Sequence, residues 1–355
     1  MNILVLIPED REVAAACFAG DTNRPVGETK IAFSRGHAPD ARFDPAPTPW
    51  LRDAWGALAG SPAPDLVALV CPFAGTLIQA PVVVDDAVRA GLAELAPQAP
   101  EDLPVFLPVL DNAAAAFPSV RRVVFPETAF FADLPPGEAI PALDAETLAA
   151  VPLRRYGHHG LFHEAAAREM ARRRGRNAPR VLSICLEPKP EVAAVLGERP
   201  VMVSGGATRL AGLPGHTDCG QLDPSTALKI AADLGWSPER IRLVLTDESG
   251  LLGLTGRAIA LPELFTATDP EALFVKAVLE YRMLLFCGAG VAAMGGADVV
   301  AFSGRYVALA EQIGPWLQTR LQLYGSGARR GVAWEVFGTP RAVIVAESAA
   351  QRFAG

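Results

Sequence analysis

Short apolar runs that stop at a turn-forming residue recur along the chain and predict buried strands. The first spans residues 3–7 and stops at Pro8, and the next spans residues 65–71 and stops at Pro72. Runs of this length that end at a breaker are typical of strands buried in a sheet. On the same evidence we expect further strands at residues 104–110, 122–125, 180–186, 298–302 and 341–345.

Apolar residues at helical spacing lie between these runs and predict helices. Two of the expected helices, at 225–234 and 270–294, come with the Asp-Pro pairs 223–224 and 269–270. An aspartate at the N-cap followed by proline in the first turn is a strong helix-start signal. Gly295 then indicates a helix stop with a glycine C-cap, in preference to a phosphate loop. The remaining expected helices span 85–95, 163–174 and 238–245, whereas 20–50 is expected to be irregular.

Strands that alternate with helices predict α/β domains with mixed sheets. A chain of 355 residues is long enough for two domains, each with its own core. The proline-rich stretch at 134–152 is the expected boundary. We therefore expect an N-terminal α/β domain at 1–150 and a C-terminal α/β domain at 151–334, with the last segment, 335–355, packed on the first domain.

Composition narrows the range of partners and compartments. The net charge of −7 and pI near 5.4 argue against a nucleic-acid partner, and the basic run at 168–176 is interpreted as the solvated end of a helix. The sequence contains no run of 18 uncharged apolar residues, so we expect no membrane span. The start of the chain is expected to form a strand and not a signal peptide. The five scattered cysteines lack a CxxC pair and favour a reducing cytoplasm.

Four polar motifs occur in a fixed order along the chain. They are FPETAF at 125–130, RRYGHHGLFH at 154–163, DESGLLGLTG at 247–256 and a block at 281–304 that contains MGGAD and FSG. Together they resemble the acetate kinase (acetokinase) family, whose patterns read FDTAFH, RYGFHGxSH, SGLLGxSG and GAYxAxMGGxDxxVFTxG. Residues 185–224 are also similar, without a gap, to a further block of that family.

The resemblance implies a fold and a reaction. The fold is that of the actin-like ATPase and sugar-kinase superfamily, with two related α/β domains and an active site in the cleft between them. The reaction is ATP-dependent phosphorylation of a short-chain carboxylate, acetate or propionate, to an acyl phosphate, catalysed with Mg²⁺ by a cytoplasmic homodimer. The implied site residues are Glu127 and His159 as catalytic residues, Asn112, His163 and Asp218 at the substrate, Ser303 and Gly304 at the nucleotide, and Glu347 at the metal.

The same alignment shows where this chain departs from the family. The first phosphate turn becomes Pro8-Glu9-Asp10-Arg11-Glu12, and the second, at 185–190, becomes Cys-Leu-Glu-Pro-Lys-Pro. Prolines have no N–H with which to bind phosphate, and carboxylates repel it. Arg305 follows Gly304 where the family has a third glycine-rich loop, residues 259–262 replace an adenosine contact, and Asp218 stands where the family has an arginine. An acid in place of an arginine inverts the local charge.

Three hypotheses follow for function. In the first, the chain is a divergent homologue with weak or no carboxylate kinase activity, a pseudokinase candidate that binds a ligand or partner in the old cleft. In the second, it is an enzyme of changed chemistry, in which Asp111, Glu127, His159 and Asp218, with His158, His163, His216 and Cys219 nearby, bind a transition metal such as Zn²⁺ or perform acid–base catalysis. The competing interpretation is that these residues are scaffold remnants and that Cys219 is inert. In the third, a rebuilt site supports a weak phosphotransferase.

Overall fold

The computed structural model describes residues 1–9, 11–33, 46–59, 63–151, 153–175, 179–321 and 332–353. These residues divide into two compact units. The first comprises Met1–Ala132 with Thr339–Gly355, and the second comprises Asp133–Gly338. The expected folding domains at 1–150 and 151–334 remain a prediction. Residues 34–45 and 354–355, together with Asp10, Pro152 and Arg176, about which expectations were stated, lie outside the described residues.

A six-stranded mixed sheet forms the centre of the first unit, with the order β3-β2-β1-β4-β6-β5. Its middle strands, β1 (Asn2–Pro8) and β4 (Leu66–Cys71), pair in parallel, and β4 pairs in parallel with β6 (Arg121–Pro126). The strands β2 (Glu12–Ala19), β3 (Gly27–Ala32) and β5 (Val82–Val83) are antiparallel to their neighbours. Every residue of β4 is buried, as its uninterrupted apolar run predicts.

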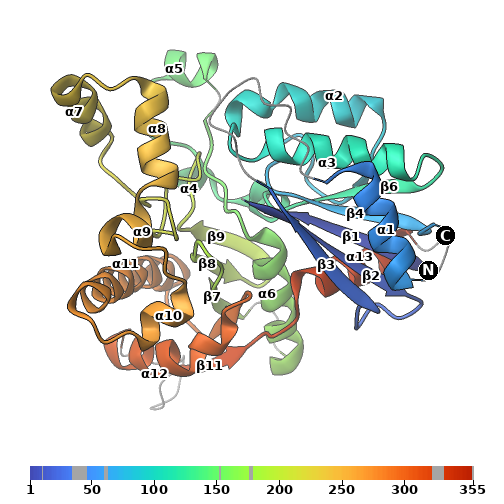
Figure 1. Ribbon diagram of the computed structural model, residues 1–355. Helices are drawn as coiled ribbons and strands as arrows, with labels where there is room; N and C mark the ends of the chain where they lie inside the picture. The colour runs from blue at the N-terminus through green and yellow to red at the C-terminus, as the bar shows by residue number, and fades with distance from the viewer. Residues whose placement is uncertain are drawn as a thin grey trace. The chain divides into compact units, whose positions relative to one another are not determined.

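Four longer helices accompany this sheet within the described residues: α1 (Thr48–Ala59), α2 (Asp86–Glu94), α3 (Leu103–Ala116) and α13 (Arg341–Phe353). The C-terminal helix α13, red in Figure 1, returns to the first unit and contacts the blue strand β1 and also β4. A short 3-10 turn, η1 (Ala96–Gln98), joins α2 to α3, and another, η2 (Ala129–Asp133), ends the segment after β6.

The second unit repeats the same sheet plan. Its order, β9-β8-β7-β10-β11, matches β3-β2-β1-β4-β6, with an antiparallel meander on one side and parallel strands on the other. The strands are β7 (Arg180–Cys185), β8 (Glu191–Leu196), β9 (Arg199–Val203), β10 (Val299–Ser303) and β11 (Ala333–Val336). The same strand order and strand directions in both units are expected for a pair of related α/β domains.

The helices of the second unit differ in how many of their own residues are buried. Its core packs around α11 (Pro270–Met294), which contacts β7, β8 and β9 and buries a residue on every turn, from Ala272 to Met294. By contrast, α7 (Pro224–Leu234) buries no residue. The other helices are α4 (Pro136–Ala139), α5 (Ala145–Ala150), α6 (Gly160–Arg174), α8 (Pro238–Asp247), α9 (Gly250–Thr255), α10 (Leu261–Thr266) and α12 (Ala310–Leu321), with a 3-10 turn η3 (Val307–Leu309).

One described helix, α11, is long and apolar enough to cross a membrane by length and composition. Its buried residues belong to the same core cluster as Leu182, Val192 and Phe302 from the sheet. Only 28% of the apolar window of α11 is buried, so one face of the helix packs on the sheet, whereas Phe274 and Tyr281, which are 61% and 60% exposed, lie on another face.

Three secondary-structure expectations were wrong. Residues 104–110 and 341–345 form the helices α3 and α13 and not strands, and the 20–50 segment contains β3 and the start of α1. In α3 the buried positions Leu103, Phe106 and Leu110 recur at helical spacing. A short apolar run does not distinguish a buried strand from a buried helix face, and here packing on the sheet decides.

The Asp-Pro helix starts are confirmed, and they support a stability prediction. The Asp269 side chain accepts a hydrogen bond from the Ala272 N–H at 3.0 Å at the start of α11, and Asp223 caps α7 through the Ser225 N–H at 2.9 Å. Replacing an N-cap aspartate by alanine costs about 1 kcal/mol. We expect Asp269→Ala to lower the free energy of global unfolding by about that amount, measured by urea denaturation, because one face of α11 is part of the core.

Asp223→Ala is the matched control, because it removes the same kind of cap from a helix with no buried residue. It should increase hydrogen exchange within α7 and leave the urea midpoint almost unchanged. Equal midpoint shifts for the two variants would contradict the assignment of α11 as the core helix.

Candidate functional site

The turn between β7 and β8 and the first residue of β8 carry three charged residues at alternate positions. Glu187, Lys189 and Glu191 are separated by Pro188 and Pro190. The prolines restrict the backbone and supply no N–H, so the polar contacts of this turn are made by the charged side chains and by backbone carbonyls such as that of Pro188, which accepts the His216 N–H at 3.0 Å. Each of the three reaches a different segment of the second unit.

Glu187 binds the segment that follows β10. Its carboxylate accepts the backbone N–H of Arg305 at 2.7 Å through Oε1 and the guanidinium Nε of Arg305 at 3.0 Å through Oε2. Glu187 is buried, with 3 % of its surface exposed. A charge at this depth is stable only when it is paired and hydrogen-bonded, and Arg305 supplies both conditions.

Ser303 and Gly304, the expected nucleotide-binding residues, lie directly beside this pair. The Leu186 N–H donates to the Ser303 carbonyl at 2.8 Å, and the Tyr306 N–H donates to the Leu186 carbonyl at 2.9 Å. Gly304 adopts a φ of +94°, and a Cβ there would lie 2.7 Å from the Leu186 oxygen. The close approach of two backbones therefore requires glycine at 304.

Lys189 binds Asp218, the residue that inverts a charge relative to the family pattern. The ammonium Nζ lies 2.5 Å from Asp218 Oδ1, and it also contacts the Arg209 carbonyl oxygen. The two side chains are only 12 % and 11 % exposed. The acid expected to contact substrate is thus neutralised by a cation of the same unit.

Glu191 binds the start of α6, where the RRYGHHGLFH motif ends. Its carboxylate accepts the backbone N–H groups of His158, at 3.0 and 3.1 Å, and of His159, at 3.1 Å. The ring Nε2 of His163 lies 3.3 Å from Glu191 Oε1. A carboxylate at a helix N-terminus satisfies unpaired N–H groups and complements the helix dipole.

These contacts alter the acidity of Glu191. Burial alone would raise the pKa of its carboxyl, but the hydrogen bond from His163 and the charges of His159, His163 and His158 outweigh burial and lower the pKa to about 2. Glu191 is therefore an anion at neutral pH, although it is 4 % exposed.

The ring of His159 is engaged by the same turn. Its Nε2 lies 3.0 Å from the Lys189 carbonyl oxygen, and because a carbonyl only accepts, Nε2 carries the proton. This contact supports the interpretation that the histidine hydrogen-bonds locally and helps to hold the turn.

His163, expected at the substrate, is completely buried. Its Nδ1 lies 2.8 Å from Ser183 Oγ, and its Nε2 faces Glu191. Hydroxyl, imidazole and carboxylate in this order are also found in nucleophilic hydrolases. Here Ser183 is buried as well, which argues against attack on a substrate by this hydroxyl, and the expected contact of His163 with substrate stays a prediction.

Glu127 and Asn112, the other expected acceptor-side residues, lie in the first unit. Glu127 follows β6, and its N–H donates to the Cys71 carbonyl at 2.9 Å. Its carboxylate is buried and forms an ion pair with Arg341, with Nε 3.3 Å from Oε1. Asn112 lies on α3 next to Asp111, whose two oxygens each accept a 2.8 Å hydrogen bond from Arg89.

Arg341 is a residue that the sequence analysis missed. It is the first residue of α13, where a cation is opposed by the helix dipole, and that unusual position signals a nearby acid. The signal was hidden because 341–345 was expected to be a strand. Glu347, the expected metal ligand, lies farther along the same helix, and burial raises its pKa.

The metal hypothesis for the His and acid set finds no support in the described residues. No group of three or more His, Cys, Asp or Glu side chains in this part of the chain could hold a metal ion. The Cys219 thiol donates to the Gly220 carbonyl, and its pKa is raised by burial and then by Asp218. A raised pKa lowers the thiolate fraction and favours the inert interpretation.

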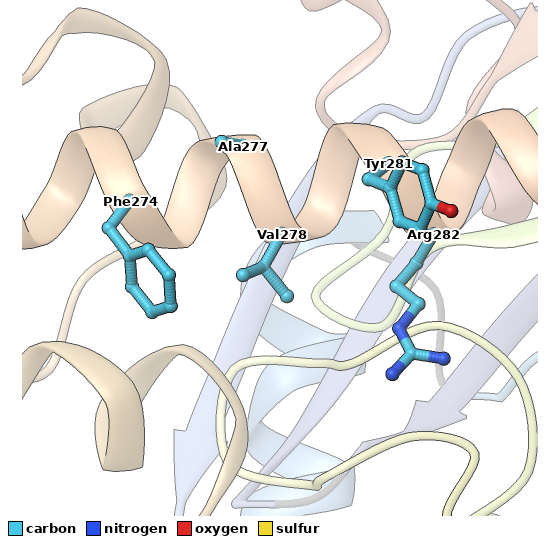
Figure 2. A pocket seen from close by; sticks show the side chains of 5 residues that line it. All are labelled: Phe274, Ala277, Val278, Tyr281 and Arg282. Atoms are coloured by element: carbon cyan, nitrogen blue, oxygen red, sulfur yellow. The ribbon is translucent and has the colours of Figure 1, made fainter.

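A separate hollow of about 430 Å³ lies on the outer face of α11. Figure 2 shows the side chains that line it, all from α11: Phe274, Ala277, Val278, Tyr281 and Arg282. The lining contains no acid, histidine or cysteine, so this hollow does not coincide with the candidate residues.

Comparison with known proteins identifies relatives for most of the chain. A family model described as "Acetokinase family" matches residues 71–347. An acetate kinase of Shewanella amazonensis is 32% identical over 228 residues, which cover 63% of this chain and 57% of the relative. An acetate kinase of Clavibacter sepedonicus is 33% identical over 233 residues, covering 64% and 59%. The match thus spans less than two thirds of the length of these relatives.

Solved structures with the same fold are also found. An acetate kinase of Porphyromonas gingivalis superposes with a TM-score of 0.83 at 20% identity and covers 99% of both chains. A propionate kinase of Francisella tularensis superposes with a TM-score of 0.82 at 19% identity and covers 98% of both. At this identity the likeness establishes the fold, and the expected fold class is confirmed.

The low pKa of Glu191 predicts how stability changes with pH. Its folded-state pKa of about 2 lies below its ordinary value of 4.5, so the ionised carboxylate stabilises the protein above about pH 4.5 and this contribution is lost as the pH falls towards 2. The difference corresponds to roughly 3 kcal/mol. We expect Glu191→Gln to be less stable than the parent at pH 7 and the two curves to converge in acid, measured by urea denaturation.

Glu164→Gln is the control, because Glu164 lies on α6 in an exposed i,i+4 pair with Arg168. Such a pair contributes little, so this variant should follow the parent curve. Parallel curves for Glu191→Gln and the parent from pH 7 to 3 would contradict the assigned role of Glu191.

Proposed function

The chain belongs to the acetokinase family, and on that premise we propose that it is a divergent member in which the family reaction is weak or absent. That reaction transfers the terminal phosphoryl group of ATP to a short-chain carboxylate, acetate or propionate, and yields an acyl phosphate. The observation that carries the proposal is the binding of the Glu187 carboxylate by the N–H and guanidinium of Arg305.

A nucleotide site needs backbone N–H donors and cations aimed at phosphate. In the turn after β7, Pro188 and Pro190 provide no N–H, and the N–H of Arg305 is already used by Glu187. The cation Lys189 is neutralised by Asp218. The residues present therefore do not fit the phosphates of Mg-ATP.

The expected catalytic acid, Glu127, does not offer a free carboxylate to Mg²⁺ either. Mg²⁺ binds carboxylate oxygens that are free to coordinate it, whereas the Glu127 carboxylate is paired with the Arg341 guanidinium. A guanidinium beside the acid repels a divalent cation. Glu127 and Arg341 therefore do not fit a Mg²⁺ site in this arrangement.

If the chain has residual kinase activity, we assign the roles of its residues from the resemblance to the family. Glu127 and His159 would orient the reacting groups, Asn112, His163 and Asp218 would surround the acceptor, Ser303 and Gly304 would contact nucleotide, and Glu347 would help to hold Mg²⁺. Substrate would be a small carboxylate or acyl phosphate. These assignments are proposals, and so are the homodimer and the cytoplasmic location. The free cysteines support the location.

Two other functions remain as proposals. An enzyme of changed chemistry is favoured by the concentration of His158, His159, His163 and Glu191 at one helix start, although the burial of His163 counts against it. A non-catalytic protein that binds a small ligand or partner is favoured by the internal pairing of Glu187, Lys189 and Glu127, because paired charges hold the fold without nucleotide.

Thermal unfolding with Mg-ATP, combined with an assay for acyl phosphate, tests the proposal. A ligand that binds only the folded state at about 100 times its dissociation constant adds roughly 2.7 kcal/mol of stability. We expect no shift of the unfolding midpoint with Mg-ATP or Mg-ADP, and no acyl phosphate from acetate or propionate.

The acetate kinase of Porphyromonas gingivalis, run under identical conditions, is the positive control for both measurements. A clear midpoint shift of this chain with Mg-ATP, together with acyl phosphate that accumulates with time, would overturn the proposal and restore the carboxylate kinase.

A further inference from the structure

We propose that the outer edge of β3 pairs with β3 of a second copy of this chain, in antiparallel orientation and centred on Thr29. In the described part of the chain, β3 (Gly27–Ala32) is the last strand of its sheet and pairs only with β2. An edge strand presents backbone donors and acceptors to which another strand can add. This contact joins copies of the chain, and it does not depend on whether the chain is a kinase.

The register with β2 shows which backbone groups of β3 face the open edge. The Phe33 N–H donates to the Arg11 carbonyl at 2.8 Å, and the pairing of β2 with β3 continues from this point without a shift. In an antiparallel pair, residues that bond to the neighbouring strand alternate with residues that do not. The N–H and C=O groups of Glu28, Lys30 and Ala32 therefore point away from β2.

The two faces of β3 differ in what covers them. The odd-numbered residues are partly buried under α1, which lies so close that a Cβ on Gly27 would be 2.5 Å from Leu58 Cδ2. Glu28 and Lys30 are exposed on the opposite face. The Lys30 side chain remains 67 % exposed, although it pairs with Glu12 at 2.9 Å. A strand added at this edge places its own side chains beside this exposed acid and base.

The alternating charges of β3 are complementary to themselves. When Thr29 lies opposite Thr29 of the second copy, Glu28 of each copy lies opposite Lys30 of the other. Because these residues point to the open edge, each such pair can exchange N–H···O=C bonds in both directions and form an ion pair on the exposed face. A two-fold axis through Thr29 repeats every contact, as an isologous dimer requires.

The same charges disfavour the neighbouring registers. A shift of the second copy by two residues in one direction places Glu28 opposite Glu28, and a shift in the other direction places Lys30 opposite Lys30. Like charges directly opposite each other destabilise a strand pair. A lysine on an edge strand usually discourages pairing, and of these three registers the one centred on Thr29 gives each lysine an acid to face.

The size of the contact sets its strength. A stable protein interface buries roughly 800 Å² per partner, which is more than one six-residue strand supplies. We therefore expect a weak association that increases with protein concentration. It should also weaken as salt is added, because ion pairs between exposed side chains are screened.

Charge reversal tests the register. Glu28→Lys places lysines opposite each other in both pairs, and Lys30→Glu places acids opposite each other. We expect each variant to associate roughly 10-fold or more weakly than the parent, measured by sedimentation velocity at low salt, because two attractive pairs become repulsive. A 1:1 mixture of the two variants should regain the association of the parent, since every lysine of one variant then faces an acid of the other.

The mixture distinguishes this contact from damage to the fold and from association through another surface. A misfolded variant stays deficient when it is mixed, and a contact elsewhere does not respond to the charges at 28 and 30. Single variants that associate as the parent does, or a mixture that associates no better than its components, would overturn the proposal.

A cysteine at the centre of the register detects the contact directly. In an antiparallel pair, opposite residues that do not exchange hydrogen bonds have Cα atoms about 4.5 Å apart, which is within reach of a disulfide. Thr29 and its copy form such a pair. We expect Thr29→Cys to give a covalent dimer after mild oxidation with oxidised glutathione, seen on a non-reducing gel.

Ala32→Cys is the matched control. Ala32 lies on the same strand and is exposed, so random collisions reach it at least as easily as residue 29. In the proposed register the two copies of residue 32 lie about 20 Å apart, too far for a disulfide. Absence of a covalent dimer from Thr29→Cys, or an equal yield from Ala32→Cys, would contradict the pairing.

Discussion

The pairing of buried charges in the turn between β7 and β8 is the constraint on which the second unit depends. Glu187 and Lys189 lie in this turn and Glu191 begins β8. The prolines between them donate no hydrogen bonds, so each charge has to be matched by another segment. Arg305 after β10, Asp218 in a distant loop and the start of α6 provide the partners. The turn therefore joins three segments that are far apart in sequence, and removing one partner would leave an uncompensated buried charge.

The two sheets show why this turn is placed where ligands are expected. Each unit has an antiparallel meander joined to parallel strands, and the first hairpin turn of each begins at the end of a central strand. In the first unit this turn starts with Pro8 and Glu9, and in the second it contains Pro188 and Glu187. Proline and acid thus occupy both turns, where a phosphate-binding protein would need glycine and free N–H groups.

Much of the fold could be predicted, and two of the three errors have one cause. The runs at 3–7 and 65–71 became β1 and β4, and the Asp269-Pro270 signal located the start of α11. The wrong assignments, at 104–110 and 341–345, concern short apolar runs that suit either a strand or a buried helix face. The choice depends on which surface they pack against, and α13 packs on β1 and β4, a contact that local sequence does not contain.

The sequence by itself determined the family, the α/β class, the helix starts and the loss of glycines from the turn after β7, because motifs, caps and prolines act locally along the chain. Only the tertiary structure decided what the changed residues do. Glu187 and Arg305 are separated by 118 positions, and Arg341 approaches Glu127 from the other end of the chain. From the sequence alone, the Glu187 carboxylate is expected to repel phosphate. In the folded chain it forms a buried ion pair with Arg305, which the sheet brings near. This could not be foreseen because electrostatic energy depends on distance in space and not in sequence.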